Sequence, residues 1–407
     1  MPDILISGRV FCILNLNFLP LVASNRTTAY NALGSDECYQ KPKYDIRNTR
    51  KMPEVFKNIL IMKPSSLGDI VLALPALTAL RRNFPKAKIT WLLRPEFAAL
   101  LENHPHLDQI IPFDRKLMAK AWYNPGALSG LVSLVLRLRA GKFDVVFDFQ
   151  GLFRTASLAW LSGCRKRFGR AAAREFAHLF YTDKVHQDMQ CAHLVDYYLK
   201  MIYTAGTGDV SVEFVLTENP EAAGSVAGLL TNQRISADNY AVVVPGSAHA
   251  DKCWPTERFA ELADKITEKF GFSIVATGTG SEASVVEKLQ SLANVPIANL
   301  AGQTSLSELM VLLKGARLVV SNDTGPGHIA AASGVPLVLI FGRSNPIRVA
   351  PYGRKQCVVA VDAEGRGLAI NSTNPKHNIR AITVDQVYEK VCEQIDNHPS
   401  TGASSHS

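Results

Sequence analysis

The chain has 407 residues, of which 47% are apolar and 20% are charged. This length predicts two or three domains. The composition is that of a globular protein, which excludes a collagen-like chain and a chain disordered throughout. The 44 Lys and Arg residues exceed the 36 Asp and Glu residues, which gives a net charge of +8. A modest positive charge suits an anionic ligand or surface, although many unrelated enzymes share it.

Seven cysteines are scattered along the chain, and no two have Cys-x-x-Cys spacing. An odd number without paired spacing argues against a disulfide framework or a zinc ribbon, and fits free thiols in a reducing compartment. The sequence also contains no HExxH or DxD motif. We therefore expect a reaction that needs neither a metal nor another cofactor.

The N-terminal segment 1–55 is expected to be an extension that is disordered or arises from a misassigned start, because Met52 stands just before the first well-formed strand. Two other interpretations stay open for Val10–Ala23, a signal-peptide core or a segment that contacts a membrane. Two asparagines interrupt this apolar run, and it is too short to span a membrane as a helix. The small, polar tail 398–407 is expected to be disordered.

From residue 56 onward, short β-rich runs alternate with longer amphipathic stretches. This alternation predicts a parallel sheet with helices on both faces. In the first half, the predicted strands are Asn58–Lys63, Lys88–Leu93, Gln109–Phe113 and Asp144–Asp148. The predicted helices are Asp69–Asn83, Pro125–Ala140, Leu152–Leu161 and Cys191–Tyr203.

The same pattern starts again near residue 239. The predicted strands are Tyr240–Val244, Ser273–Thr277, Ile297–Leu300, Arg317–Ser321 and Pro336–Phe341. The predicted helices are Glu257–Phe270, Glu282–Leu292, Ser305–Lys314, Gly327–Ser333 and Val384–Asp396. We therefore predict an α/β protein with Rossmann-like, doubly wound domains over 56–225 and 239–382, followed by a C-terminal helix over 383–397. Ligands of such sheets lie beyond the carboxyl ends of the strands, so the expected site is the cleft between the two halves.

The first stretch that carries chemistry is Lys63–Asp69 (KPSSLGD), directly after the first strand. Gly68 permits a tight turn from strand to helix, and Asp69 then stands at the start of the helix. One interpretation is structural, because acidic residues near a helix N-terminus are stabilised by the helix dipole. The other is a general base that removes a proton from a substrate hydroxyl. The two roles are compatible.

The second stretch, Val244–Pro255, follows the first strand of the second half. Its small residues allow the backbone N–H groups to approach a phosphate. Lys252 supplies a mobile positive charge that suits a phosphate oxygen. Taken alone, however, Lys252 is equally well explained as a solvated surface lysine.

The third stretch, Val320–Ala332, is the most informative one. Two glycines and a proline separate a buried strand from a helix of small residues, and the N-terminus of that helix presents free N–H donors. Such a turn favours an anion, to which Thr324 adds a hydroxyl group. His328 alone is as well explained by a core or capping role as by contact with a ligand.

Three weaker stretches complete the set. Thr277–Glu282 lacks the full GxGxxG spacing, so it is poor support for a dinucleotide. Glu282 either accepts hydrogen bonds from a ribose or sugar hydroxyl or only favours a helix start. Asp148–Arg154 ends a strand at the expected cleft, and Arg165–Arg174 holds five cations. Such a run is usually a solvated face, but it also suits an anionic acceptor or lipid head groups.

Together, KPSSLGD, PGS…KCWP and SNDTGPGHIAAA resemble the motifs of family 9 glycosyltransferases, the ADP-heptose:lipopolysaccharide heptosyltransferases, in the family's order. The resemblance runs from about Ile59 to Ile395. It implies the GT-B fold, in which two Rossmann-like domains face each other across a cleft. The heptosyltransferases often have Leu-Ser where this chain has Pro326 and Gly327, and this departure leaves the transferred sugar open.

The resemblance also implies roles for individual residues. Asp69 matches the family's base, and Lys252 matches its donor-phosphate lysine. The remaining donor-binding positions that it implies are Ser66, Ser247, Glu282, Asp323, Thr324, Gly325 and His328. For the acceptor, we predict Gln150 and Arg154, in the stretch that ends a strand at the expected cleft.

The implied activity is an inverting, metal-independent transfer of heptose from ADP-heptose to the Kdo or heptose inner core, carried on lipid A. The expected location is the cytoplasm, at the inner face of the inner membrane, with no nucleic acid and no stable protein partner. One alternative is transfer of another sugar, or to another acceptor, within the family. An NAD-dependent oxidoreductase is less favoured because the glycine fingerprint after the first strand is missing. A sugar-nucleotide or lipid-binding protein without catalysis is disfavoured by the presence of both Asp69 and Lys252.

Overall fold

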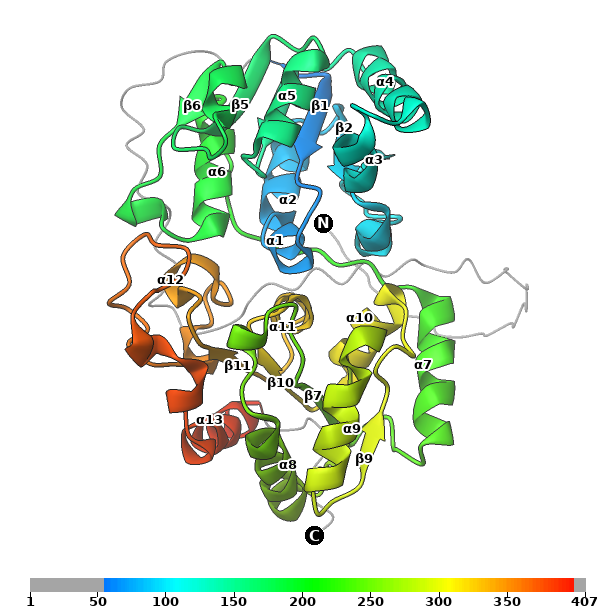
Figure 1. Ribbon diagram of the computed structural model, residues 1–407, viewed down its shortest axis with the longest axis vertical. Coiled ribbons are helices and arrows are strands. Elements are labelled where there is room, and N and C mark those ends of the chain that lie inside the picture. Colours follow the sequence, from blue (N-terminus) through cyan, green and yellow to red (C-terminus); the bar gives the residue numbers. More distant parts are fainter. Residues whose placement is uncertain (1–54, 399–407) are drawn as a thin grey trace, which may run out of the picture.

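The computed structural model describes residues 55–398. The chain forms two domains, one above the other in Figure 1. Each domain contains a six-stranded parallel sheet. The α/β class and the two Rossmann-like domains predicted from the sequence are confirmed. The expectations for the extension and for most of the C-terminal tail fall on residues 1–54 and 399–407, outside the described part.

The N-terminal sheet has the strand order β3-β2-β1-β4-β5-β6. Its strands are β1 Asn58–Met62, β2 Lys88–Leu93, β3 Gln109–Pro112, β4 Val145–Asp148, β5 Lys166–Arg170 and β6 Asp183–Val185. The strand order reverses between β1 and β4, which are neighbours in the sheet. Loops at such a reversal leave the sheet in opposite directions and open a crevice at the carboxyl ends of the strands.

Helices cover both faces of this sheet, because successive residues of a buried strand point to opposite sides. Ile59 and Ile61 pack toward the helices α2 and α6, whereas Leu60 and Met62 pack toward α4 and α5. The helices of this domain are α1 Leu67–Val71, α2 Leu74–Asn83, α3 Arg115–Lys120, α4 Pro125–Ala140, α5 Phe153–Leu161 and α6 Leu194–Thr204.

The C-terminal sheet repeats the same topology with the order β12-β11-β10-β7-β8-β9. Its strands are β7 Tyr240–Val244, β8 Ser273–Ala276, β9 Ile297–Asn299, β10 Leu318–Asn322, β11 Leu337–Phe341 and β12 Val358–Ala360. The reversal lies between β7 and β10, which pair directly.

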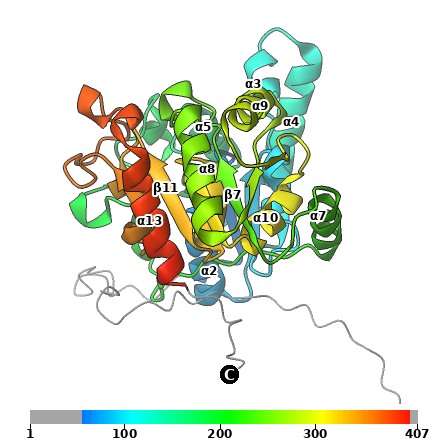
Figure 2. The same cartoon turned by 90° about the horizontal axis from the view of Figure 1, so that it is seen from below.

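The C-terminal helices also form two layers (Figures 1 and 2). Their bounds are α7 Pro220–Asn232, α8 Thr256–Phe270, α9 Ala283–Leu292, α10 Leu306–Gly315, α11 Gly325–Ala332, α12 Pro346–Val349 and α13 Val384–Asp396. The face with α10 and α11 turns toward the N-terminal domain, and its buried residues belong to the same hydrophobic cluster as the N-terminal core. A second cluster joins α8, α9 and α13 on the other face.

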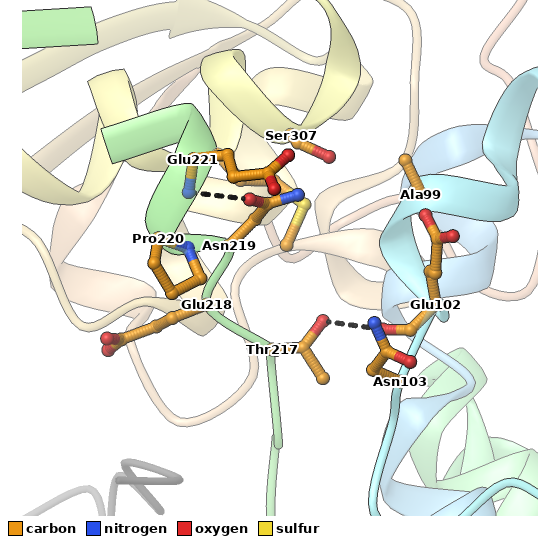
Figure 3. Close-up of a pocket in the computed structure, with 10 residues that line it drawn as sticks. Ala99, Glu102, Asn103, Thr217, Glu218, Asn219, Pro220, Glu221 and Ser307 are labelled. Carbon is orange, nitrogen blue, oxygen red and sulfur yellow. Dashed lines mark hydrogen bonds between the residues drawn. The ribbon is translucent and has the colours of Figure 1, made fainter. Parts of the chain in front are cut away.

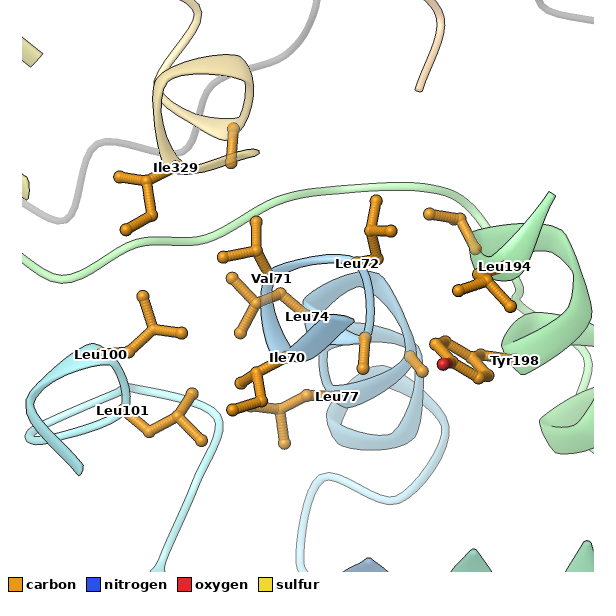
Figure 4. Close-up of a cluster of buried hydrophobic side chains, with 14 of the residues drawn as sticks. Ile70, Val71, Leu72, Leu74, Leu77, Leu100, Leu101, Leu194, Tyr198 and Ile329 are labelled. Atoms are coloured by element: carbon orange, nitrogen blue, oxygen red, sulfur yellow. The ribbon is translucent and has the colours of Figure 1, made fainter. Parts of the chain in front are cut away.

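The shared cluster makes the contact between the domains apolar. Ile329 of α11 lies near Val71 of α1, and Leu72 and Leu74 continue the cluster into the N-terminal domain (Figure 4). Apolar area removed from water contributes about 25 cal/mol per Å². Burial of this apolar surface therefore stabilises the contact between the two domains.

Three segments differ from the sequence expectation. The single helix predicted over Asp69–Asn83 is broken at Leu72 and Ala73 into α1 and α2. The cation-rich run contains the strand β5, which was not predicted. Arginine and lysine occupy positions on both faces of this strand and conceal the alternation of apolar and polar residues. The stretch 205–238, expected as a boundary, contains α7, which packs against α10. The predicted limit at residue 225 therefore falls inside a helix of the C-terminal layer.

A matched pair of leucines tests the C-terminal core. Leu313 of α10 is fully buried, whereas Leu292 at the end of α9 is 42% exposed. We expect Leu313→Ala to lower the free energy of unfolding by about 2–5 kcal/mol, because it leaves a cavity. Leu292→Ala should change it by less than about 0.5 kcal/mol. Urea titration measures both, and equal effects would contradict the assigned core.

Candidate active site

The loops selected from the sequence leave the two sheets at their reversal points. Lys63–Asp69 follows β1, and Asp148–Arg154 follows the neighbouring strand β4. In the other domain, the loop before α8 follows β7, and Asp323–His328 follows the neighbouring strand β10. The candidate site is therefore built from the four loops at which parallel sheets of this kind bind ligands.

The starts of α1 and α11 touch each other across the domain boundary. A Cβ atom on Gly68 would lie 2.5 Å from Cδ2 of His328, and a Cβ atom on Gly325 would lie 2.6 Å from Cδ2 of Leu67. Real Cβ atoms do not approach other atoms so closely. Glycine at both positions therefore permits the approach, and the predicted base loop and donor loop meet.

A chain of polar contacts leads from this point into the C-terminal domain. Nε2 of His328 lies 3.3 Å from Oδ1 of Asp323, and Nζ of Lys252 donates to Oδ2 of Asp323 over 2.9 Å. Asp323 is buried. Burial alone would raise its pKa, but His328 and Lys252 outweigh burial and hold the pKa far below the ordinary value. Asp323 is therefore a fixed negative charge that positions Lys252 and His328.

Asp69 lies at the first turn of α1 with one carboxylate oxygen engaged. Its Oδ2 accepts hydrogen bonds from the backbone N–H of Ser66 (3.3 Å), from the Ser66 hydroxyl (3.1 Å) and from Nζ of Lys63 (3.2 Å). Within the described part of the chain, no hydrogen bond reaches Oδ1, and the side chain is 31% exposed. Oδ2 is thus held in place by hydrogen bonds, and Oδ1 is available to accept a proton.

The electrostatics of Asp69 depend on Lys63, which the sequence analysis did not single out. Burial alone would raise the pKa of Asp69, but Lys63 and the Ser66 hydrogen bonds outweigh burial and lower it. Burial would lower the pKa of Lys63, and Asp69 reverses that effect, so both groups are charged at neutral pH. The carboxylate is available as a base, but Lys63 reduces its strength.

The end of β4 is fixed by Asp148. Its Oδ1 accepts from the backbone N–H groups of Gln150 (3.0 Å) and Gly151 (3.1 Å), and its Oδ2 accepts from the Tyr181 hydroxyl (2.8 Å). Asp148 therefore shapes the loop. The side-chain oxygen of Gln150 is buried without a hydrogen-bond partner, and such a group costs free energy unless a ligand or water satisfies it. This supports the predicted role of Gln150.

Two arginines from different domains meet beside this loop. Arg170, at the end of β5, and Arg348 of α12 both donate to Oε1 of Gln187, over 3.1 and 3.3 Å. Arg348 is only 4% exposed. Burial and the nearby Arg170 lower its pKa. Within residues 55–398, neither guanidinium group forms a salt bridge, and the negative charge of Asp69 acts on Arg348 only at longer range.

Asn322, which the sequence analysis also missed, holds the second loop in place. Its Nδ2 donates to the carbonyl oxygen of Pro245 (2.9 Å), and its Oδ1 accepts from the backbone N–H of Trp254 (3.0 Å). The side chain is completely buried. Because Pro245 and Trp254 flank Lys252, one amide fixes both ends of its loop. A buried asparagine at the end of a strand, next to Asp323, was the available signal.

The N-terminus of α11 carries no side-chain cap. Thr324 occupies the cap position, but its hydroxyl bonds to the Ser321 hydroxyl (3.1 Å) and to the Asn322 carbonyl (3.3 Å). The first N–H groups of the helix are therefore not satisfied by the cap residue. Together with the helix dipole, they favour a negatively charged group at this end.

Glu282 joins the loop after β8 to the loop after β7. Its Oε2 accepts from the backbone N–H (2.7 Å) and the hydroxyl (2.8 Å) of Thr279. A Cβ atom on Gly246 would lie 2.4 Å from Oε1 of Glu282, so the loops after β7 and β8 touch. Ser247 is next to this contact and is partly exposed. Glu282 thus also has the structural role considered from the sequence.

The structure unites most of the predicted residues. The loop that carries Ser66 and Asp69 meets, through Leu67 and Gly68, the group of Lys252, Asp323, Thr324, Gly325 and His328 at the α1–α11 contact. Arg154, in the first turn of α5, is partly buried and makes no side-chain hydrogen bond within the described part. Its acceptor role stays a prediction, as do the roles of the others.

The run Arg165–Arg174 is divided by β5. Arg165 precedes the strand and lines a surface depression of about 640 Å³ with Lys142, near the start of β1. Arg167 donates to the carbonyl oxygens of Cys164 and Phe180. Only Arg170, at the end of β5, reaches the candidate site. The run therefore does not form one cationic surface.

A separate cavity of about 530 Å³ lies between the domains, beside the linker (Figure 3). Its lining includes Glu102, Glu218 and Glu221, and the hydroxyl of Thr217 donates to the carbonyl oxygen of Glu102 over 3.3 Å. This acidic cavity contains none of the predicted site residues. We therefore assign no role in the reaction to it.

Two Rossmann-like domains whose reversal-point loops meet across a domain boundary form the GT-B architecture of glycosyltransferases. The family model described as Glycosyltransferase family 9 (heptosyltransferase) matches residues 131–378, which include the donor-side loops but begin after Asp69. The chain belongs to glycosyltransferase family 9, and it is a glycosyltransferase.

Similar proteins agree with this assignment. Lipopolysaccharide heptosyltransferase 1 of Escherichia coli K12 is 30% identical over 314 residues, covering 75% of this chain and 94% of that protein. The protein of the same name from Pseudomonas aeruginosa is 31% identical over 311 residues, covering 75% of this chain and 84% of that protein. The structure of E. coli heptosyltransferase WaaC with ADP-2-deoxy-2-fluoro heptose has a TM-score of 0.63 at 27% identity, covering 82% of this chain and 99% of that one.

Two kinds of structure are absent from residues 55–398. In this range, no helix has both the length and the apolar character that a membrane span requires. The same range brings together no three His, Cys, Asp or Glu side chains in a way that would hold a metal ion.

The Lys63–Asp69 pair generates a pH prediction. Because Lys63 stabilises the carboxylate form, Asp69 should stay ionised below the pH at which an ordinary aspartate is protonated. We expect Lys63→Met to raise the pKa of Asp69, whereas Lys63→Arg, which keeps the cation, should leave it low. Carboxyl ¹³C NMR titration measures both, and an unchanged pKa in Lys63→Met would show that Lys63 is not the cause.

The α1–α11 contact generates a second prediction. In Gly325→Ala, the new Cβ must push Leu67 away and move Asp69 with it, so we expect kcat to fall at least about tenfold. Gly224→Ala in α7 is the matched control, because a Cβ there meets nothing within 4 Å, and its kcat should not change. Adding Leu67→Ala to Gly325→Ala should recover part of the rate. Normal turnover by Gly325→Ala would refute the proposed importance of this contact.

Proposed function

We propose that this glycosyltransferase transfers a heptose from ADP-heptose to the Kdo or heptose inner core of lipopolysaccharide, with inversion at the anomeric carbon and without a metal ion. The relatives named above support the donor and acceptor classes. The observation that carries the mechanism is the contact of Gly68 with His328. It joins Asp69, with its free Oδ1, to the donor loop that contains Lys252.

On the donor side, the diphosphate of ADP-heptose would lie at the start of α11. The N–H groups there are free of a side-chain cap, and Lys252 is held beside them by Asp323. As the bond between the anomeric carbon and the phosphate oxygen breaks, its electron pair leaves with ADP. Preorganised N–H groups and Lys252 stabilise this growing negative charge.

On the acceptor side, a hydroxyl group would approach Oδ1 of Asp69. Its oxygen attacks the anomeric carbon from the face opposite the departing ADP, and its proton passes to Asp69. This single displacement inverts the anomeric configuration. A base weakened by Lys63 suits this step, because the proton moves only as the acceptor oxygen becomes acidic in an oxocarbenium-like transition state.

The cationic residues near Asp69 favour an acidic acceptor. Arg170 and Arg348 share the Gln187 amide and form no salt bridge within the described residues, although Asp69 attracts Arg348 at longer range. A Kdo residue carries a carboxylate, and arginine binds carboxylates well. We therefore assign this pair and Gln150 to the acceptor side, where Arg154 was predicted from the sequence.

We place the reaction at the cytoplasmic face of the inner membrane, because the proposed acceptor is anchored there by lipid A. Nucleic acid and a stable protein partner have no part in this proposal. The sugar is tested by a panel of nucleotide sugars offered with a Kdo-terminated acceptor. Preferential transfer from ADP-heptose supports the proposal, and preference for another nucleotide sugar contradicts it.

The proposed base is tested by Asp69→Asn, which keeps the shape of the side chain. We expect kcat to fall at least about a hundredfold, with little change in the affinity for ADP. Asp144→Asn is the matched control, since Asp144 bonds to the backbone N–H groups of Lys57 and Asn58 at the far end of β1. Near-normal turnover by Asp69→Asn would remove the mechanism.

A further inference from the structure

The helix α4 exposes an apolar stripe. Leu128, Val132 and Leu136 are spaced four residues apart, so they lie on one side of the helix, and each is about half exposed or more. Just before α4, Trp122 is 85% exposed and Tyr123 is 56% exposed. Large apolar side chains grouped in this way usually mark an interaction surface.

The apolar surface extends beyond α4. The helix α5 lies beside α4 over the same face of the sheet, and α3, α4 and α5 are on one side of the N-terminal domain (Figures 1 and 2). α5 exposes Phe153 and Trp160, and the short helix Ala177–Phe180 packed against it exposes Leu179. We call this surface the α4–α5 face; its exposed apolar residues are Trp122, Tyr123, Leu128, Val132, Leu136, Phe153, Trp160, Phe176 and Leu179.

The segment that contains α3 and α4 is positively charged. Residues 115–143 contain six lysines and arginines and neither aspartate nor glutamate. All six cations are exposed: Arg115, Lys116, Lys120, Arg137, Arg139 and Lys142. The segment thus combines leucine, tryptophan and tyrosine with basic residues, which is the composition of a helix that lies in the interface of an anionic bilayer.

We propose that the α4–α5 face is a docking surface for anionic phospholipids. Trp122, Tyr123 and the α4 stripe enter the head-group region, where amphipathic aromatic rings are stabilised. The lysines and arginines around them meet the negative surface potential of the bilayer. The proposal rests on the proposed function, because the N-terminal domain, which carries the proposed base Asp69, also carries this face, and the proposed acceptor is anchored in the same bilayer.

The charge of the α4–α5 face favours a bilayer over a second copy of this chain as its partner. A symmetric dimer through the α4–α5 face would bring together two segments that carry six cations each and no acidic residue. Like charges brought together disfavour that contact, whereas an anionic lipid surface compensates them. The run Arg165–Arg174, which the sequence suggested for this role, contributes little, since Arg167 is occupied by backbone carbonyl groups.

The first test is sedimentation with vesicles. We expect the full chain to sediment with phosphatidylglycerol-containing vesicles, not with pure phosphatidylcholine vesicles, and to be released by salt. The variant Trp122→Ser, Val132→Ser, Leu136→Gln should bind the anionic vesicles at least about tenfold more weakly. The matched control is Leu292→Gln, Ile370→Gln, which changes exposed apolar residues of the C-terminal domain and should bind normally.

The second test compares two forms of one acceptor. The triple variant should lose activity on a lipid-anchored acceptor in vesicles, while its rate on the deacylated acceptor in solution stays normal. This normal rate also shows that the variant is folded. Equal losses on both acceptors would overturn the proposal, and so would unchanged vesicle binding.

Two further outcomes are informative. If light scattering finds a dimer that the triple variant dissociates, a second copy covers the α4–α5 face and the proposal is wrong. If no nucleotide sugar supports transfer to a Kdo-terminated acceptor, the proposed function fails. Sedimentation still decides the lipid-binding proposal in that case, because it needs no substrate.

Discussion

The candidate active site depends on a close approach of two helix starts, where only glycine leaves enough room. Gly68 lies against His328, and Gly325 lies against Leu67. Without this approach, Asp69 would stand alone at one sheet edge, and the pair of Lys252 and Asp323 would stand at another. With it, the loop that carries the Asp69 carboxylate touches the loop that carries Asp323, the partner of Lys252, as the proposed transfer from a nucleotide sugar requires.

Charge balance keeps this site functional. Asp69 and Asp323 are both buried to some extent, and burial alone would raise their pKa values. Asp69 is held ionised by Lys63, and Asp323 by Lys252 and His328. Arg170 and Arg348 are the exception, since they have no salt-bridge partner within residues 55–398. The positive charge of Arg170 and Arg348 and the uncapped start of α11 both favour anionic substrates.

The sequence allowed the fold and the loops that meet at the α1–α11 contact to be predicted well, because both depend on local signals. Buried strands appear as apolar runs, and loops rich in glycine directly after them mark the reversal points. Residues whose roles depend on distant contacts were missed. Lys63 looks like a strand end, Arg348 like a surface cation and Asn322 like a turn residue, and only the folded chain shows their partners. The strand β5 was hidden for the same reason, because its cations point to different surroundings.

The central claim is that donor and base share one space, and a crystal structure of the enzyme with ADP-2-deoxy-2-fluoro-heptose tests it most directly. The account predicts the diphosphate at the start of α11, within hydrogen-bond distance of Lys252 Nζ, and the anomeric carbon facing Oδ1 of Asp69. A diphosphate bound elsewhere, or an anomeric carbon turned away from Asp69 with the two domains in contact, would contradict it.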